Sequence, residues 1–132
     1  MTLPTYPDAD EAAAKWLAAQ QSIHWWADER AEPPNLLAWL PFVWVRPVGG
    51  GISDDTFDRP TCDVEWFASS QDACKALSIA GRSLLVFGLP GYHEPGLTVA
   101  RVIEQSRPRP MPYDDQKIHR RSGNYSLVIQ PH

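Results

Sequence analysis

The clearest pattern of apolar and polar residues lies near the middle of the chain. Cys62, Val64 and Trp66 alternate with Asp63 and Glu65, and this is the period of a strand with one buried and one solvated face. We therefore expect a strand here, with the two carboxylates on an open acidic surface.

A helix is predicted directly after this strand. Apolar residues recur at positions 73, 77, 80, 84 and 87, which is the spacing of one helical face. Ser69, followed three residues later by Asp72, resembles a capping box with Asp in place of the usual Glu or Gln. Gly88 and Pro90 provide the stop signals. Because the joint between strand and helix is so short, the two elements should form one rigid unit.

An amphipathic helix is also predicted near the start of the chain, where Asp8 or Asp10 can cap it. Two prolines at positions 33 and 34 prevent its continuation, so it should end by about Arg30. Its apolar stripe has spacings of three and four and consists of Ala12, Trp16, Ala19, Ile23 and Trp26.

Three further strands are predicted. The run at 36–45 is apolar on both faces, which is typical of a strand covered on both sides. Pro41 implies a bulge or an edge position within it, since proline cannot donate a hydrogen bond to a neighbouring strand. Residues 97–103 and 125–129 predict the other two strands.

Two segments are expected to lie outside regular structure. Residues 47–58 contain three consecutive glycines and two aspartates, which indicates a flexible Gly-rich loop. Residues 104–118 form a Pro/Arg-rich arm, where prolines at 108, 110 and 112 remove alternate amide donors. We expect this arm to be a stiff extended segment.

These elements predict a single α+β domain spanning residues 1–132. Their order is helix, strand, strand, helix, strand, strand, which favours a mostly antiparallel four-stranded sheet with two helices packed on one face. A chain of 132 residues with six tryptophans can bury a sizeable core.

The charge is unevenly distributed along the chain. The net charge is −4, but residues 1–100 carry six Lys/Arg against thirteen Asp/Glu, whereas residues 101–132 carry six against three. Such asymmetry suits a molecule that meets copies of itself or other proteins through complementary faces. Ordinary scatter of surface charge is the alternative.

The residues that usually carry chemistry do not form a recognisable site. Cys62 and Cys74 lack a metal-binding spacing, and we expect both to be buried free thiols in a reducing compartment. The glycines at 49–51 are not followed by the Lys-Ser/Thr of a phosphate-binding loop. No pair of the four histidines has metal-ligand spacing on one element. We therefore expect no enzyme activity, no cofactor and no metal, and the chain contains no run long enough to suggest a membrane span or a signal peptide.

The prolines of the arm are interspersed with basic residues. This basic cluster is the best nucleic-acid candidate, but a sequence pI of about 5.5 differs from that of a dedicated binder. We favour docking of the arm on an acidic face of a neighbouring protein. The cluster consists of Arg107, Arg109, Lys117, Arg120 and Arg121.

The combined pattern resembles the tail terminator proteins of long-tailed bacteriophages. The resemblance rests on the strand ending Val43-Trp44-Val45-Arg46, the Gly-rich loop and the segment from Asp58 to Ala68, and it continues through the helix at 73–87 to the final strand. It implies a subunit of a homo-hexameric ring that caps the major tail tube protein, stops tube polymerisation and offers a face to the head-side connector or stopper protein. DNA would pass through the channel without specific binding. The protein would be assembled in the host cytoplasm and reside in the tail or neck of the virion.

The residues expected at subunit or partner interfaces are charged. We expect them to act through complementary faces, because a ring subunit must carry two different contact surfaces. A head–tail adaptor or head-completion protein that binds the portal complex is the alternative function, and a small enzyme is the third. The expected interface residues are Arg46, Asp54, Asp55, Asp63, Glu65, Arg107, Arg109, Arg120 and Arg121.

Overall fold

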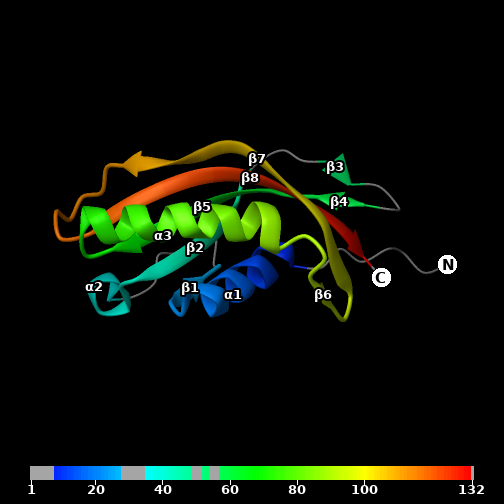
Figure 1. Cartoon of the computed structure of the whole chain (residues 1–132), viewed down its shortest axis with the longest axis horizontal. Helices are drawn as coiled ribbons and strands as arrows, with labels where there is room; N and C mark the ends of the chain where they lie inside the picture. Colours follow the sequence, from blue (N-terminus) through cyan, green and yellow to red (C-terminus); the bar gives the residue numbers. More distant parts are fainter. Residues whose placement is uncertain (1–7, 28–34, 49–51, 54–56, 132) are drawn as a thin grey trace.

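The computed structural model describes residues 8–27, 35–48, 52–53 and 57–131 (Figure 1). Within these ranges the chain forms a curled mixed sheet of eight strands, three α-helices and one π-helical turn, η1. The elements are α1 (Ala9–Gln21), β1 (His24–Trp26), α2 (Leu36–Trp39), β2 (Phe42–Pro47), β3 (Ile52–Ser53), β4 (Asp58–Arg59), β5 (Thr61–Ala68), α3 (Gln71–Ser83), η1 (Leu84–Gly88), β6 (His93–Glu94), β7 (Leu97–Met111) and β8 (His119–Pro131).

The long strand β8 organises the sheet. It pairs antiparallel with β5 along one side and with β7 along the other. Strand β4 continues the line of β5 beyond Pro60 and also pairs with β8. On the far side of β5 lies β2, and β1 pairs parallel to β2 at one edge. The opposite edge is formed by β7, to which the short β6 is added at Leu97 and Thr98.

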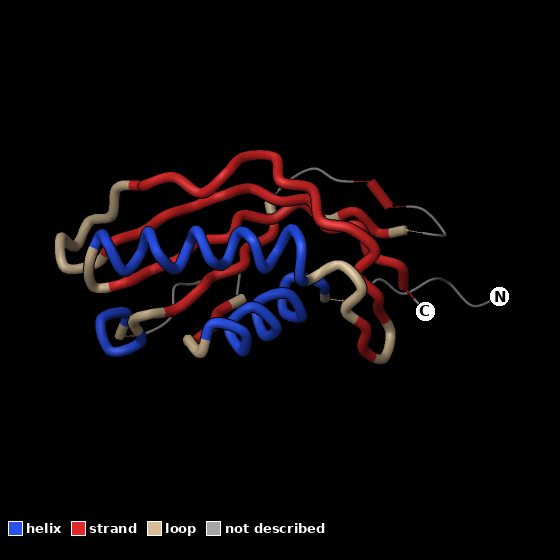
Figure 2. Tube along the Cα trace, in the orientation of Figure 1, coloured by secondary structure: helices blue, strands red, loops and turns tan. Residues whose placement is uncertain are grey.

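Helices α1 and α3 cover the same face of this sheet (Figure 2). Helix α1 lies against β1 and β2, and α3 lies against β5 and β8. Trp66 and Tyr125 are fully buried beneath them. The Trp66 Nε1–H donates a 3.0 Å hydrogen bond to Gln21 Oε1, and Gln21 Nε2 donates one to the Leu77 carbonyl oxygen. This bridge fixes β5, α1 and α3 to one another.

The opposite face of the sheet has a second, smaller core. Phe42 and Phe67 stack with ring centroids 4.5 Å apart, and both are fully buried. Trp39 of α2 meets Phe42 edge to face at 6.5 Å, and Tyr113 meets Phe67 at 5.8 Å. Helix α2 and the turn between β7 and β8 therefore cover one end of this face.

The predicted fold is wrong in its architecture. The sheet has eight strands instead of four, it contains a parallel pair, and α2 adds a third helix on the face that α1 and α3 leave uncovered. The first helix ends at Gln21, because Ser22 adopts a left-handed conformation with φ of 56°, and residues 24–26 form β1 instead of a last helical turn. The apolar run at 36–45 is divided between α2 and β2.

The arm predicted at 104–118 is also wrong, because β7 continues through it to Met111. Pro108 and Pro110 are accommodated since β7 is an edge strand and its register shifts between Ser106 and Arg109. Part of the loop predicted at 47–58 is strand as well, in β2, β3 and β4. The remainder of that loop, including Asp54 and Asp55, lies outside the described residues.

Candidate interaction surfaces

The first charged cluster lies on the sheet face that α1 and α3 leave uncovered, which we call the open face. Strand alternation places Arg46 of β2 opposite Asp63 of β5. Arg46 Nη2 donates a 2.9 Å hydrogen bond to Glu65 Oε1 and lies 3.8 Å from Asp63 Oδ2. Asn124 of β8 donates to Asp63 Oδ1 at 2.9 Å. The carboxylates therefore belong to a paired polar network.

Glu65 is the most buried member of this network, with a side chain only 3% exposed. The prediction that it lies on an open acidic surface with Asp63 is wrong, because Arg46 from the adjacent strand covers and pairs both acids. Burial raises the pKa of Glu65, whereas the nearby Arg46 and Arg120 guanidiniums lower it, and burial is the larger effect. The Arg46 guanidinium also stacks over Trp44 at 5.0 Å.

The raised pKa of Glu65 predicts a pH dependence of stability. The folded protein retains the Glu65 proton at pH values where the unfolded chain has lost it, so the free energy of unfolding should fall as the pH rises from the ordinary carboxyl range through the folded pKa. Glu65→Gln should remove this fall and leave the protein at least as stable as the wild type at pH 7. Denaturant unfolding at a series of pH values checks this. The exposed Asp114→Asn is the control, and a Glu65→Gln profile parallel to that of the wild type would contradict the assignment.

Arg109 and Arg120 complete a recess of about 320 Å³ on the open face. Arg120 Nη2 donates to the Pro112 carbonyl oxygen at 2.6 Å, and its guanidinium lies 5.3 Å from the Tyr113 ring centroid. Arg109 is exposed on β7. We call this hollow the open-face recess; its walls are Arg46, Asp63, Glu65, Ser106, Arg109, Met111, Arg120, Ser122, Gly123 and Asn124.

A second cationic surface lies on the other side of β7. Arg107 and Arg121 line a groove between α3 and β7, together with Arg82 of α3. The groove has a volume of about 310 Å³. We call it the α3–β7 groove, and Ser78, Ile79 and Pro108 complete its lining.

The register shift of β7 between Ser106 and Arg109, and the alternation of Arg120 and Arg121 on β8, therefore divide the predicted basic cluster. Arg109 and Arg120 face the open face, whereas Arg107 and Arg121 face the α3–β7 groove. Lys117 lies in neither hollow, on the turn before β8, where its backbone amide bonds to Asp115. Among the described members of the predicted interface, Arg46, Asp63, Glu65, Arg109 and Arg120 come together in the open-face recess.

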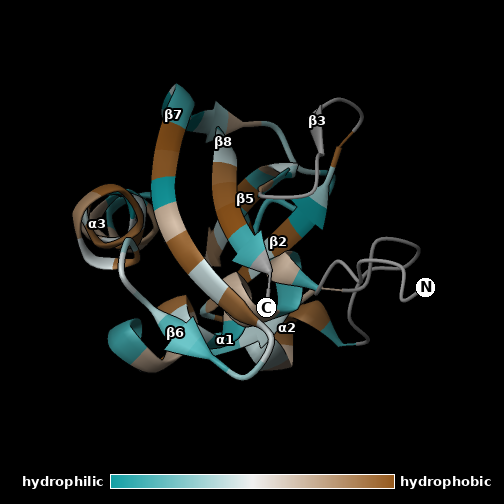
Figure 3. Ribbon diagram, turned by 90° about the vertical axis from the view of Figure 1, so that its right-hand side faces the viewer, coloured by the Kyte–Doolittle hydropathy of each residue, from teal (hydrophilic) through white to brown (hydrophobic). Residues whose placement is uncertain are grey.

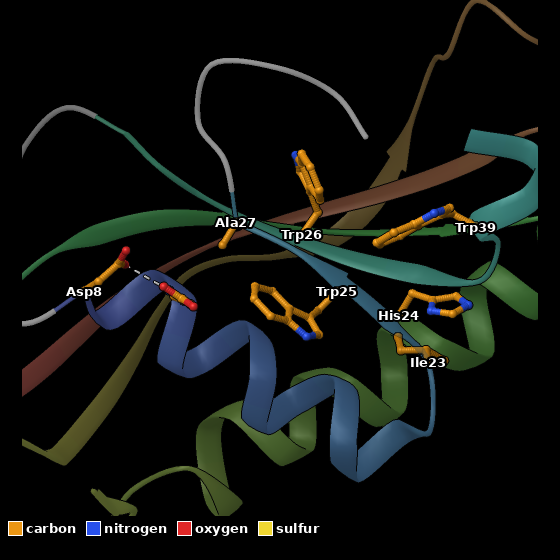
Figure 4. A pocket seen from close by; sticks show the side chains of 8 residues that line it. Asp8, Ile23, His24, Trp25, Trp26, Ala27 and Trp39 are labelled. Carbon is orange, nitrogen blue, oxygen red and sulfur yellow. Dashed lines mark hydrogen bonds between the residues drawn. The ribbon is translucent and has the colours of Figure 1, made fainter. Parts of the chain in front are cut away.

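The β1 edge of the sheet carries a surface that the sequence reading missed (Figure 4). Trp25 points toward α1, while Trp26 points to the other side of the strand, toward Trp39, with ring centroids 5.9 Å apart. Asp8 and Glu11 of α1 lie beside them around a hollow of about 510 Å³. The run His24-Trp25-Trp26 fits a helical stripe equally well, so its sequence carries little signal for an edge strand.

Both cysteines are buried free thiols, as predicted. The Cys74 Sγ–H lies 3.2 Å from the Trp66 carbonyl oxygen, and burial raises its pKa to about 11. Burial likewise raises the pKa of the Cys62 thiol. Neither thiol is therefore an activated nucleophile.

No group of three His, Cys, Asp or Glu side chains that could hold a metal ion occurs in the part of the chain that the structure describes. Across the same residues, none of the helices has the length and apolar character needed to cross a membrane. No model of a known protein family matches the chain, and no curated protein matches it.

Proposed function

We propose that this chain is the ring-forming tail terminator of a long-tailed bacteriophage. In this role it assembles head to tail into a hexamer, caps the tube of the major tail protein, stops its polymerisation and presents its other face to the head-side connector. DNA passes through the ring without specific binding, and the assembled ring resides in the neck of the virion after assembly in the host cytoplasm. Subunit contacts, not catalysis, are the activity.

The observation that carries the proposal is the difference between the two edges of the sheet. Strand β1 forms one edge, beside the acids Asp8 and Glu11 and two tryptophans. Strand β7 forms the opposite edge and exposes Arg101 and Arg109. A heterologous ring contact requires two such unlike surfaces on one subunit. Lys15 already pairs with Glu11 and lies over Trp25 at the β1 edge, and the guanidinium groups of β7 can replace it, because they bind carboxylates and stack on indole rings.

The distance between the two edge strands of the sheet supports the same assignment. The two edges are separated by β2, β5 and β8, and neighbouring strands lie about 4.8 Å apart. Contacts at opposite edges therefore point away from each other, which allows copies to add side by side. The sheet is curled (Figure 3), so its two edges are rotated relative to each other, and closure into a ring needs such a rotation between copies.

Capping of tubes tests the proposed function. Tail-tube protein that polymerises alone should form tubes of uncontrolled length, and adding this chain should shorten them in electron micrographs and leave a ring at one end. Tubes of unchanged length in the presence of excess protein would overturn the proposal. Binding to a portal ring without binding to tubes would assign the chain to the head–tail adaptors instead.

Reversing the charge of the β7 edge should weaken self-association. Arg101→Glu combined with Arg109→Glu replaces two positive charges at the contact by two negative charges, and both residues are exposed, so folding should be unaffected. We expect the association constant to fall at least about tenfold, more at low salt than at high salt. Sedimentation velocity at two ionic strengths measures this. Lys75→Glu, exposed on α3, is the control, and equal effects from both variants would contradict an edge-specific contact.

A further inference from the structure

The α3–β7 groove contains guanidinium groups that the fold holds in fixed positions. Arg121 Nε donates to Ser78 Oγ at 2.8 Å, and Arg121 Nη2 donates to the Pro108 carbonyl oxygen at 3.2 Å. Arg82 Nε donates to Glu104 Oε2 at 2.7 Å. Side chains held in this way lose little rotamer freedom when they bind a further group.

These guanidiniums retain donors for a ligand. A guanidinium has five N–H donors, and among the described residues Arg121 donates through Nε and Nη2, which leaves Nη1 for a ligand. Arg107 is exposed and makes no hydrogen bond or ion pair within the described ranges of the chain. The open guanidinium of Arg107 and the Nη1 group of Arg121 therefore face the same hollow, and neither arginine has a carboxylate partner among the described residues.

The charge of the groove is positive. Its lining carries Arg82, Arg107 and Arg121. The carboxylate that meets these arginines from the neighbouring elements is Glu104, which is bound to Arg82 and also accepts a 3.0 Å hydrogen bond from the Tyr125 hydroxyl. An anionic group entering the groove thus meets uncompensated positive charge at Arg107 and Arg121.

The groove also has an apolar rim. Ile79 lies in its wall with 54% of its surface exposed. A ligand that covers this side chain removes apolar surface from water, which favours binding. A nucleic-acid backbone offers phosphates but no aliphatic group to cover Ile79, whereas a peptide offers both carboxylates and aliphatic side chains. The combination favours a protein ligand.

We propose that the α3–β7 groove binds an extended acidic segment of a partner protein. Carboxylates of the segment bind Arg107 through paired N–H···O hydrogen bonds and Arg121 through its Nη1 group, and an aliphatic side chain next to them covers Ile79. The proposal goes beyond the ring assignment, because a solitary subunit carries the same groove. Binding of a peptide and mass of the assembly are separate measurements, so either proposal can fail while the other stands.

Fluorescence anisotropy with the full chain tests this site. The probe is a labelled peptide with the repeat Glu-Leu-Glu-Gly, compared with a peptide in which Gln replaces Glu and with a labelled oligothymidylate. We expect the Glu peptide to bind and the Gln peptide to bind at least tenfold more weakly, because charge-assisted hydrogen bonds are lost. Arg107→Gln should weaken binding of the Glu peptide about tenfold, and Ile79→Asp should weaken it more, because it adds a negative charge to the wall.

Lys117→Gln is the matched control, since Lys117 is an exposed cation that lies outside the groove and outside β7. It should change binding less than about twofold. The proposal is overturned by equal losses in Lys117→Gln and Arg107→Gln, by equal affinity for the Glu and Gln peptides, or by an oligothymidylate that binds at the groove more tightly than the Glu peptide. Ile79 and Arg107 are both exposed, so these variants should fold, and circular dichroism confirms this before each titration.

Discussion

Replacing Phe67 by alanine is expected to lower the free energy of unfolding by about 3–5 kcal/mol, the range measured for large aromatic side chains in well-packed cores. Phe67 is fully buried, stacks on Phe42 and meets Tyr113 edge to face. Its removal leaves a cavity between β2, β5 and the turn before β8, where the short helix α2 cannot collapse without losing its own contacts. Chemical denaturation monitored by tryptophan fluorescence measures the loss.

Leu37→Ala provides the comparison for Phe67→Ala. Leu37 belongs to α2, the helix that packs over the same face of the sheet, but its side chain is 50% exposed. Its truncation should therefore lower the free energy of unfolding by less than about 1 kcal/mol. A Phe67→Ala variant as stable as Leu37→Ala would mean that the aromatic cluster on the open face is not a core.

Replacing Gly81 by alanine should destabilise the protein by about 2–3 kcal/mol, the upper range for overpacking. In an exposed helix this change normally stabilises by up to about 1 kcal/mol. Here a Cβ at position 81 would lie 2.5 Å from Cζ2 of Trp66. Trp66 cannot withdraw easily, because it is fully buried and its indole nitrogen is bound to Gln21. Thermal or denaturant unfolding measures the effect.

A double-mutant cycle separates this clash from helix propensity. Trp66→Leu removes the ring that opposes Gly81, so Gly81→Ala in that background should cost at least 0.5–1 kcal/mol less than in the wild type, roughly the size of coupling between touching residues. Ser83→Ala, at an exposed position of the same helix, should change stability within about 0.5 kcal/mol. Equal costs of Gly81→Ala in both backgrounds would show that Trp66 is not the cause.

Local patterns predicted the parts of the fold that depend on neighbouring residues in the chain. The alternation around Val64 lies within β5, and Asp8 caps α1 by accepting a hydrogen bond from the Glu11 amide. The second helix begins one residue later than the capping-box pattern suggested, because Ser70, not Ser69, accepts a hydrogen bond from the Ala73 amide. Short-range periodicity and capping chemistry carry this information.

The features that depend on pairing between distant strands could not be predicted. Glu65 looks solvated in its own strand, but side chains from β2, β7 and β8 surround it, including Arg46, which lies 19 residues away in the sequence. Arg107 and Arg109 look equivalent in the arm, yet the register shifts of β7 send them to opposite sides of the sheet. The small helix α2 forms against aromatic residues that come from β2 and β5. Such contacts are set by register, which the local sequence does not encode.

Light scattering of the purified chain, alone and with tail-tube protein, tests most directly whether this molecule acts by joining copies of itself through the two unlike edges of its sheet. We predict particles with the mass of six subunits, each of 14.8 kDa, either for the purified chain alone or after tail-tube protein is added. A mass of one subunit under both conditions would contradict the account.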